Sequence, residues 1–263
     1  MSRIARFRAA DGLRYGLVTA SDQVRLIEGD LFGDWQTTDE TVALADVELV
    51  APVDPPNIIA IGLNYRKHAI ESNMAIPERP VVFIKATTAA CGPGDEIMLP
   101  RVAPNEVDYE CELAIIIGRK ARCVSEDEAF DYVLGYTCSN DVSARDCQIR
   151  LDGQWARGKS MDTFAPLGPW IETDLDPDNA NIMTRLNGET MQSSNTNDLI
   201  FGCRTLISYL SHSLTLLPGT VIMTGTPSGV GFARKPPVFL KPGDIVEIEV
   251  EGIGILTNPV VAE

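Results

Sequence analysis

The chain has 263 residues, of which 44% are hydrophobic, enough for a sizeable core in one large domain or in one domain with a small appendage. It carries 22 basic and 37 acidic residues, a formal net charge of −15 at pH 7. Because no positive excess is available to meet phosphates, we expect no nucleic acid and no anionic membrane as a partner. A small anionic substrate stays compatible, since the local field of a site can oppose the net charge.

The composition also bears on location and redox chemistry. Residues 1–12 are polar, and no apolar run reaches the ~18 residues that a membrane span needs. We therefore expect a cytoplasmic protein. The six cysteines lack CxxC spacing, which disfavours zinc and thioredoxin-type sites and is typical of reduced core thiols.

Residues 1–55 are expected to form a small β-rich N-terminal domain. Alternating segments flank the dipeptide Asp11-Gly12, which favours a hairpin, and a further strand is expected at 23–28. The proline-rich run 51–56 indicates a boundary before a second domain, residues 56–263. The first domain carries no convincing chemistry.

The second domain opens with an expected strand at 57–62, followed by a short helical segment with His68 and Glu71. These residues stand at i and i+3, so one helical turn puts them on the same face. A carboxylate on one imidazole nitrogen makes the other a general base, but a solvated helix with an incidental pair is the alternative. After an expected mobile loop, a second strand ends at Lys85, which we expect to be a solvent-exposed charge unless it points into the same cavity.

The run 113–118 is apolar and rich in β-branched residues, as is typical of a buried strand. Side chains of a strand alternate between faces, so Glu110 and Glu112 share one face and Cys111 takes the other. Two neighbouring carboxylates at an apolar strand favour a hard divalent cation between them. The alternative is a wet strand end where Arg101 or Arg119 pairs with these acids.

A third carboxylate follows the next expected strand, 133–139. Before that strand, Ser125 and Glu128 have the spacing of a capping box at the start of a short helix. Asp141 can complete a site for Mg²⁺ with Glu110 and Glu112, or it can be a helix N-cap. The local sequence does not decide between the two.

The remaining chain supplies one further candidate and several structural signals. Lys159 lies in a Gly-Lys-Ser turn that favours an inward side chain but lacks the spacing of a phosphate-binding P-loop. Asn187-Gly188 predicts a hairpin, and Asp198 is expected to cap a helix that runs to about His212. The loop 225–231 is glycine-rich, so its backbone N–H groups can approach a ligand closely, but it lacks the GxGxxG spacing of a dinucleotide site.

Taken together, five ordered motifs resemble those of the fumarylacetoacetate hydrolase superfamily over roughly residues 57–260. They are GLNYRKH (62–68), DYECEL (108–113), GYTCSNDVSARD (135–146), RGKSMDTF (157–164) and TGTPSGVG (224–231). The resemblance implies an α+β, mostly β fold, with a mixed β-roll domain behind the small N-terminal domain, and a homodimer. It implies Mg²⁺ or Mn²⁺ on Glu110, Glu112 and Asp141, and makes His68 and Glu71 a catalytic dyad on a lid.

The resemblance also implies the chemistry. Substrates would be small anionic 2-oxo acids such as acylpyruvates, whose oxygens are held by catalytic Lys159 and by substrate-binding side chains, namely Arg145, Gln148, Thr226 and, if it faces the cavity, Lys85. His68 would deprotonate a water that attacks the distal carbonyl, and cleavage of the C–C bond would leave a pyruvate enolate. The lid segment 69–80, with Met74, would set the distal specificity.

Hydrolysis is thus the first prediction, and two other reactions share the same enolate. Loss of CO₂ from an oxaloacetate-like acid needs no attacking water, and reprotonation elsewhere gives an isomerase, as with 2-hydroxyhepta-2,4-diene-1,7-dioate. A non-catalytic metal-binding homologue is a distant alternative, disfavoured by the presence of His68, Glu71 and Lys159.

Overall fold

The structure is a computed structural model that describes residues 2–263. Its largest element is a mixed twelve-stranded sheet with the order β4-β3-β2-β1-β14-β12-β11-β17-β6-β7, to which β5 and β8 are attached through β1 and β14. Its strands are β1 (Arg3–Ala9), β2 (Gly12–Val18), β3 (Gln23–Gly29), β4 (Trp35–Ala43), β5 (Glu48–Leu49), β6 (Ile58–Gly62), β7 (Val81–Lys85), β8 (Ala90–Cys91), β11 (Cys111–Ile117), β12 (Val133–Asn140), β14 (Ala165–Glu172) and β17 (Val221–Met223).

A second sheet of five strands has the order β16-β15-β18-β19-β9, and β10 and β13 form a separate pair. These strands are β9 (Ile97–Leu99), β10 (Val107–Asp108), β13 (Ser143–Ala144), β15 (Asn181–Leu186), β16 (Glu189–Asn195), β18 (Ile245–Val250) and β19 (Gly254–Ala262). Within residues 2–263 the α-helices are α1 (Arg66–Glu71), α2 (Ala156–Lys159) and α3 (Cys203–Ser213), and a π-helix spans Asp146–Leu151. The predicted α+β, mostly β fold class is confirmed.

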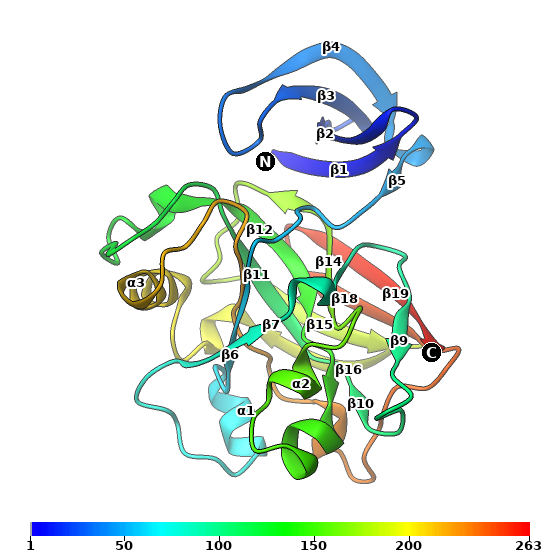
Figure 1. Ribbon diagram of the computed structural model, residues 1–263, viewed down its shortest axis with the longest axis vertical. Coiled ribbons are helices and arrows are strands. Elements are labelled where there is room, and N and C mark those ends of the chain that lie inside the picture. The colour runs from blue at the N-terminus through cyan, green and yellow to red at the C-terminus, as the bar shows by residue number, and fades with distance from the viewer. Residues whose placement is uncertain (1) are drawn as a thin grey trace.

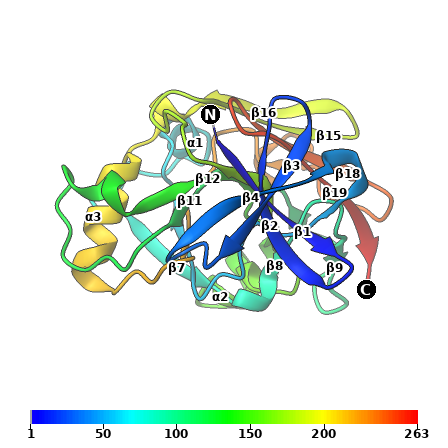
Figure 2. The same ribbon diagram turned by 90° about the horizontal axis from the view of Figure 1, so that it is seen from above.

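The N-terminal strands lie at one end of the molecule (Figure 1). Figure 2 looks down on that end, with these strands in front of the rest of the chain. The hairpin predicted at Asp11-Gly12 is confirmed, because β1 and β2 pair up to Ala9 and Gly12. A small separate core of Phe7, Val24 and Leu26 lies in this part. The sheet continues from β1 onto β14, so the boundary between residues 55 and 56 stays a prediction.

Strand β11 lies at the centre of the fold. It pairs with β12 on one side and β17 on the other, and all seven of its residues are buried. A strand covered on both faces has no polar side to alternate with, which is why Leu113 to Ile117 are apolar without a break. The five-stranded sheet packs against β11 and β12 through β15 and β18.

The helix expected from Asp198 begins later, at Cys203, with Gly202 as its N-cap. The preceding segment is held away from helical geometry by distant hydrogen bonds, because Asn64 accepts from the N–H groups of Ile200 and Phe201. Asp198 instead accepts the N–H of Lys67 at 3.1 Å, in the first turn of α1. The predicted cap is therefore real but belongs to another helix.

Two other local predictions are confirmed with one adjustment. The capping box forms, since Ser125 Oγ accepts the N–H of Glu128 and Glu128 Oε2 accepts the N–H of Ser125, both at 3.4 Å. Only a 3₁₀ turn, Ala129–Tyr132, follows it. The hairpin between β15 and β16 turns at Asn187 and Gly188, both with positive φ, as a two-residue turn of this kind requires.

Helices α1 and α2 lie at the end of the molecule opposite the N-terminal strands (Figure 1). The same end receives the start of β11, the end of β12 and the chain that leaves β6. Within residues 2–263 no helix has both the length and the apolar character needed to cross a membrane.

Candidate active site

Three buried carboxylates meet at this end of the sheet. Glu110 and Glu112 flank Cys111 at the start of β11, and Asp141 follows β12, whose Asn140 pairs with Cys111. Because the two strands are antiparallel, the start of one adjoins the end of the other. Carboxylate oxygens of Glu110, Glu112 and Asp141 all lie within 4.8 Å of one another, and the three residues are at most 5% exposed.

The alternatives for these acids are wrong. Arg101 and Arg119 do not reach the site, because Arg101 donates to the carbonyl of Glu263 and Arg119 lies by Asp131. Asp141 is followed by β13 and not by a helix, so it is no N-cap. The grouping predicted by strand alternation and by the family resemblance is the one that the fold assembles.

Two lysines compensate part of this charge. The Lys159 Nζ lies 2.8 Å from Glu110 Oε2 and 2.7 Å from Asp141 Oδ2, so the predicted inward direction is confirmed. Lys85 is 1% exposed and ion-pairs with Asp141, so the expected solvent-exposed charge is wrong. Alternation along β7 puts Lys85 on the buried face with Phe83, and it lies behind the cavity rather than among the residues that line it.

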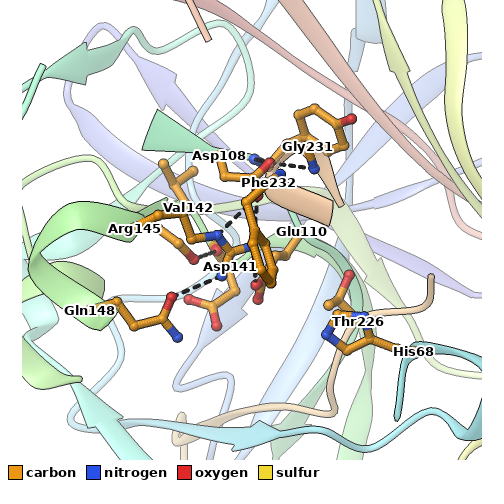
Figure 3. Close-up of polar contacts among 12 residues, drawn as sticks. His68, Asp108, Glu110, Asp141, Val142, Arg145, Gln148, Thr226, Gly231 and Phe232 are labelled. Carbon is orange, nitrogen blue, oxygen red and sulfur yellow. Dashed lines mark hydrogen bonds and ion pairs between the residues drawn. The ribbon is translucent and has the colours of Figure 1, made fainter. Parts of the chain in front are cut away.

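Arg145 extends this arrangement on the other side of Glu110. Its Nη2 lies 2.7 Å from Glu110 Oε1 and 2.8 Å from Asp108 Oδ2, and its Nη1 donates to Gln148 at 2.9 Å (Figure 3). Arg145 and Gln148 both line the cavity, but each already has a protein partner. The buried charges therefore alternate in sign along Asp108, Arg145, Glu110, Lys159, Asp141 and Lys85.

Glu112 is left out of this chain of ion pairs. Its Oε2 accepts the N–H of Gly225 at 2.8 Å, and no cation pairs with it among the described residues. Burial raises the pKa of Glu112 well above its ordinary value, and the charges of Asp141 and Glu110 raise it further. Burial also acts on Glu110, but Lys159 and Arg145 outweigh it and hold its pKa below the usual range.

This donor set fits a divalent cation. The buried charges at the site comprise four carboxylates and three cations, so one negative charge is uncompensated. Glu112 is the carboxylate that has no cation partner within residues 2–263. Its cluster with Glu110 and Asp141 offers only oxygen ligands to an ion. Oxygen-only sites of this kind select hard cations such as Mg²⁺ or Mn²⁺. The three acids can therefore hold a divalent metal, with Lys159, Arg145 and Lys85 around them.

A histidine faces the same cavity from α1. His68 is 8% exposed, so the alternative of a solvated incidental pair is wrong. Its Nδ1 lies 3.2 Å from Glu71 Oε2, and the two oxygens of Glu71 accept the N–H of Gly229 at 3.0 and 3.1 Å. The glycine-rich loop thus holds Glu71, which orients the His68 ring and leaves its other nitrogen to accept a proton.

The cavity has a volume of about 450 Å³. Its polar lining includes the three carboxylates, His68, Lys159 and Thr226, together with Arg145 and Gln148. Phe83, Trp155, Met74 and Ile149 line the remainder, so the predicted place of Met74 beside the cavity is confirmed. Thr226 accepts a hydrogen bond from Gln192 at 2.8 Å and keeps its own hydroxyl proton to donate.

Several lining or supporting residues escaped the sequence reasoning. Asp108 begins one of the quoted motifs, but the sequence predicts no role for it. Trp155 and Phe232 lie just outside the motifs 157–164 and 224–231. Asp108 stands among other acids, Glu106, Glu110 and Glu112, so no local signal distinguishes it from them. Nothing local distinguishes Trp155 or Phe232 from ordinary core aromatics.

Known families and proteins match most of this chain. Residues 57–261 match the family described as fumarylacetoacetate (FAA) hydrolase C-terminal, and residues 2–52 match one described as Rv2993c-like, N-terminal. The oxaloacetate tautomerase fahd2, mitochondrial, of Xenopus laevis is 47% identical over 82% of this chain and 69% of its own.

Two solved structures cover the whole of this chain. The 2-hydroxyhepta-2,4-diene-1,7-dioate isomerase from Mycobacterium marinum is 41% identical with a TM-score of 0.90 and is matched over 99% of its length. A fumarylacetoacetate hydrolase from Exiguobacterium antarcticum is 37% identical with a TM-score of 0.91 and is matched over its full length.

Proposed function

Since the chain belongs to the fumarylacetoacetate hydrolase family, we propose that it is a metal-dependent enzyme that interconverts the keto and enol forms of a short 2-oxo acid of the oxaloacetate type. The observation that carries the proposal is the pairing of His68 with Glu71 in the cavity that holds Glu110, Glu112 and Asp141. The tautomerase name of the Xenopus relative and the isomerase title of the Mycobacterium structure support the same reaction class.

The residues divide the work as follows. Glu110, Glu112 and Asp141 would hold Mg²⁺ or Mn²⁺, which when bound offsets the negative charge of an enolate. His68 takes the proton from the carbon beside the keto group, while Glu71 stabilises the charged ring. The enol oxygen receives a proton in turn, so the reaction needs no water and releases nothing.

Lys159 and Thr226 orient the substrate. Lys159 has three donor protons, of which two are directed at Glu110 and Asp141, so the third can meet a substrate oxygen. The Thr226 hydroxyl can donate from the side of His68. Arg145 borders the cavity while paired with Asp108 and Glu110, and it donates to Gln148. Lys85 supports Asp141 from behind.

C–C bond hydrolysis of an acylpyruvate is the second candidate, and the size of the cavity favours it. About 450 Å³ falls within the ~300–1,000 Å³ typical of pockets for drug-sized ligands, more than a four-carbon acid fills. In this reaction His68 would take a proton from water, whose hydroxide adds to the distal carbonyl. The C–C bond would then break to release a carboxylic acid and the enolate of pyruvate. A proton on the enolate carbon would complete pyruvate.

One set of assays separates these reactions. Enol-oxaloacetate and a panel of acylpyruvates are each mixed with enzyme in Mg²⁺, Mn²⁺ or EDTA, and enol absorbance, pyruvate and CO₂ are followed. Metal-dependent loss of the enol without pyruvate or CO₂ supports the tautomerase. Metal-dependent pyruvate from acylpyruvates favours the hydrolase, and CO₂ from oxaloacetate favours a decarboxylase. If none of the assays shows a metal-dependent change, the proposal is contradicted.

We also propose a homodimer in the cytoplasm, with a small anionic 2-oxo acid as the only partner of the site. Strand β7 ends the large sheet and exposes Val82 and Ile84, as an edge that pairs with a second copy would. Light scattering after size exclusion measures the dimer directly. The relative from Xenopus is described as mitochondrial, so location needs its own measurement by fractionation.

A further inference from the structure

Asp108 is a fully buried carboxylate that takes no part in the proton transfer proposed above. Its Oδ1 accepts the N–H groups of Tyr109 at 2.9 Å and Gly231 at 2.8 Å. Its Oδ2 accepts the N–H of Phe232 at 3.0 Å and the Nε and Nη2 of Arg145 at 2.9 and 2.8 Å. All five partners are donors, an arrangement that only the ionised carboxylate satisfies.

The local backbone is built around this carboxylate. A Cβ on Gly231 would lie 1.9 Å from the carbonyl oxygen of Val238 and 2.5 Å from Asp108 Oδ1, so only glycine permits the approach. Phe232, the next residue, lines the cavity, and its ring lies 4.6 Å from the Arg145 guanidinium carbon. Asp108 therefore holds both Arg145 and the aromatic ring that covers it (Figure 3).

Arg145 is shared between two carboxylates of unequal function. Its Nη2 contacts both Asp108 and Glu110, while its Nε contacts Asp108 alone. Glu110 belongs to the candidate metal-binding cluster, so a cation fully committed to its carboxylate would compete with a metal for the same charge. The Asp108 carboxylate limits that competition, because it also binds the Arg145 guanidinium.

We propose that Asp108 is a positioning residue that shares the charge of Arg145 with Glu110 and so keeps Glu110 available to a divalent metal. The proposal rests on metal binding by Glu110, Glu112 and Asp141 as proposed above. Groups behind a metal ligand typically change metal affinity by about 10–100-fold when they are removed, because they set the charge and orientation of that ligand. Without the charge of Asp108, the whole guanidinium charge falls on Glu110.

The test is the affinity of the metal-stripped full-length protein for Mn²⁺ and Mg²⁺ by titration calorimetry. Asp108→Asn is expected to weaken metal binding by about 10–100-fold. Asp108→Ser leaves room for water at the loop N–H groups, serves if the asparagine variant does not fold, and should show the same loss. The matched control is Glu172→Gln, which neutralises another carboxylate that is 1% exposed and paired with an arginine, Arg3, outside the cavity.

A double-mutant cycle separates positioning from a general structural role. If Asp108 acts through Arg145, then Asp108→Asn added to Arg145→Met should change the metal Kd by less than about threefold, far from the sum of independent effects. A Kd for the single Asp108 variants within about threefold of wild type, or an equal loss in both backgrounds, overturns the proposal. Wild-type protein that binds neither metal overturns the proposed function itself, which is a different result.

Discussion

The ammonium of Lys159 lies 2.7 Å from the Oδ2 of Asp141, and both side chains are buried. The same nitrogen reaches Glu110, so two of the three candidate metal ligands are already paired with a cation of the protein. Removing one partner of a buried ion pair leaves the other uncompensated, which is more costly than the pair is stabilising. This relationship makes the behaviour of the metal-free protein predictable.

Lys159→Met is therefore expected to destabilise the metal-free protein by about 3–5 kcal/mol. The measurement is urea unfolding in EDTA and in excess Mn²⁺, and the metal should restore more stability to the variant than it adds to wild type. Lys120→Met, at an exposed position, is the control and should be nearly neutral in both conditions. Equal metal-induced gains in Lys159→Met and wild type would contradict the prediction.

Glu112→Gln should behave in the opposite way. Because burial and its carboxylate neighbours raise the pKa of Glu112, its charge is a burden on the metal-free fold. Gln keeps the oxygen that accepts from Gly225, so the variant should unfold in EDTA at the same or a higher urea concentration than wild type. It should also lose most of the metal affinity. A large loss of stability in EDTA would show that Glu112 has a cation partner of its own.

His68→Asn is expected to lower kcat by about 10²–10⁴-fold, the usual contribution of a general base, while the metal Kd stays within a few-fold of wild type. The chain offers a matched control, since it has only two histidines and the other, His212, is exposed in the last turn of α3 and contacts the carbonyl of Ser208. His212→Asn should leave kcat unchanged. Parallel loss of turnover and metal binding in His68→Asn would make His68 structural.

Glu71→Gln tests the orientation of that base. The amide can still contact Gly229 and His68 but carries no charge to stabilise the imidazolium, so kcat should fall by about tenfold or more with KM little changed. Steady-state kinetics at saturating metal measures the split between kcat and KM. An effect confined to KM would place Glu71 in substrate binding instead.

Trp155 is expected to shape the distal end of the cavity. Its ring packs edge-on to Phe83 with centroids 5.6 Å apart, and Gly62 lacks a side chain where a Cβ would lie 2.6 Å from the indole. Trp155→Ala should lower kcat/KM for substrates with bulky apolar distal groups by about tenfold or more, and change oxaloacetate turnover much less. Trp35→Ala, on exposed β4, is the control. Equal losses for all substrates would argue against a role in specificity.

Part of this site could be deduced from the sequence. The strand period of two placed Glu110 and Glu112 on one face, the helical period placed His68 by Glu71, and the turn residues at 11–12 and 187–188 marked real hairpins. These features depend on contacts between near neighbours in the chain, which local sequence specifies. The ordered motifs then indicated the family, which residues 57–261 confirm.

Other features depended on partners far along the chain, and only the tertiary structure decided them. Lys85 follows an alternation that leaves its direction open until β7 packs beside β6, when it becomes a buried partner of Asp141, 56 residues away. Asp198 has the same capping chemistry wherever it lies, but its distance from Lys67 determines which helix it caps. The link from Asp108 through Arg145 to Glu110 likewise appears only when β10, β11 and the segment after β13 meet, because a charge selects its partner by distance in the folded protein and not by spacing in the sequence.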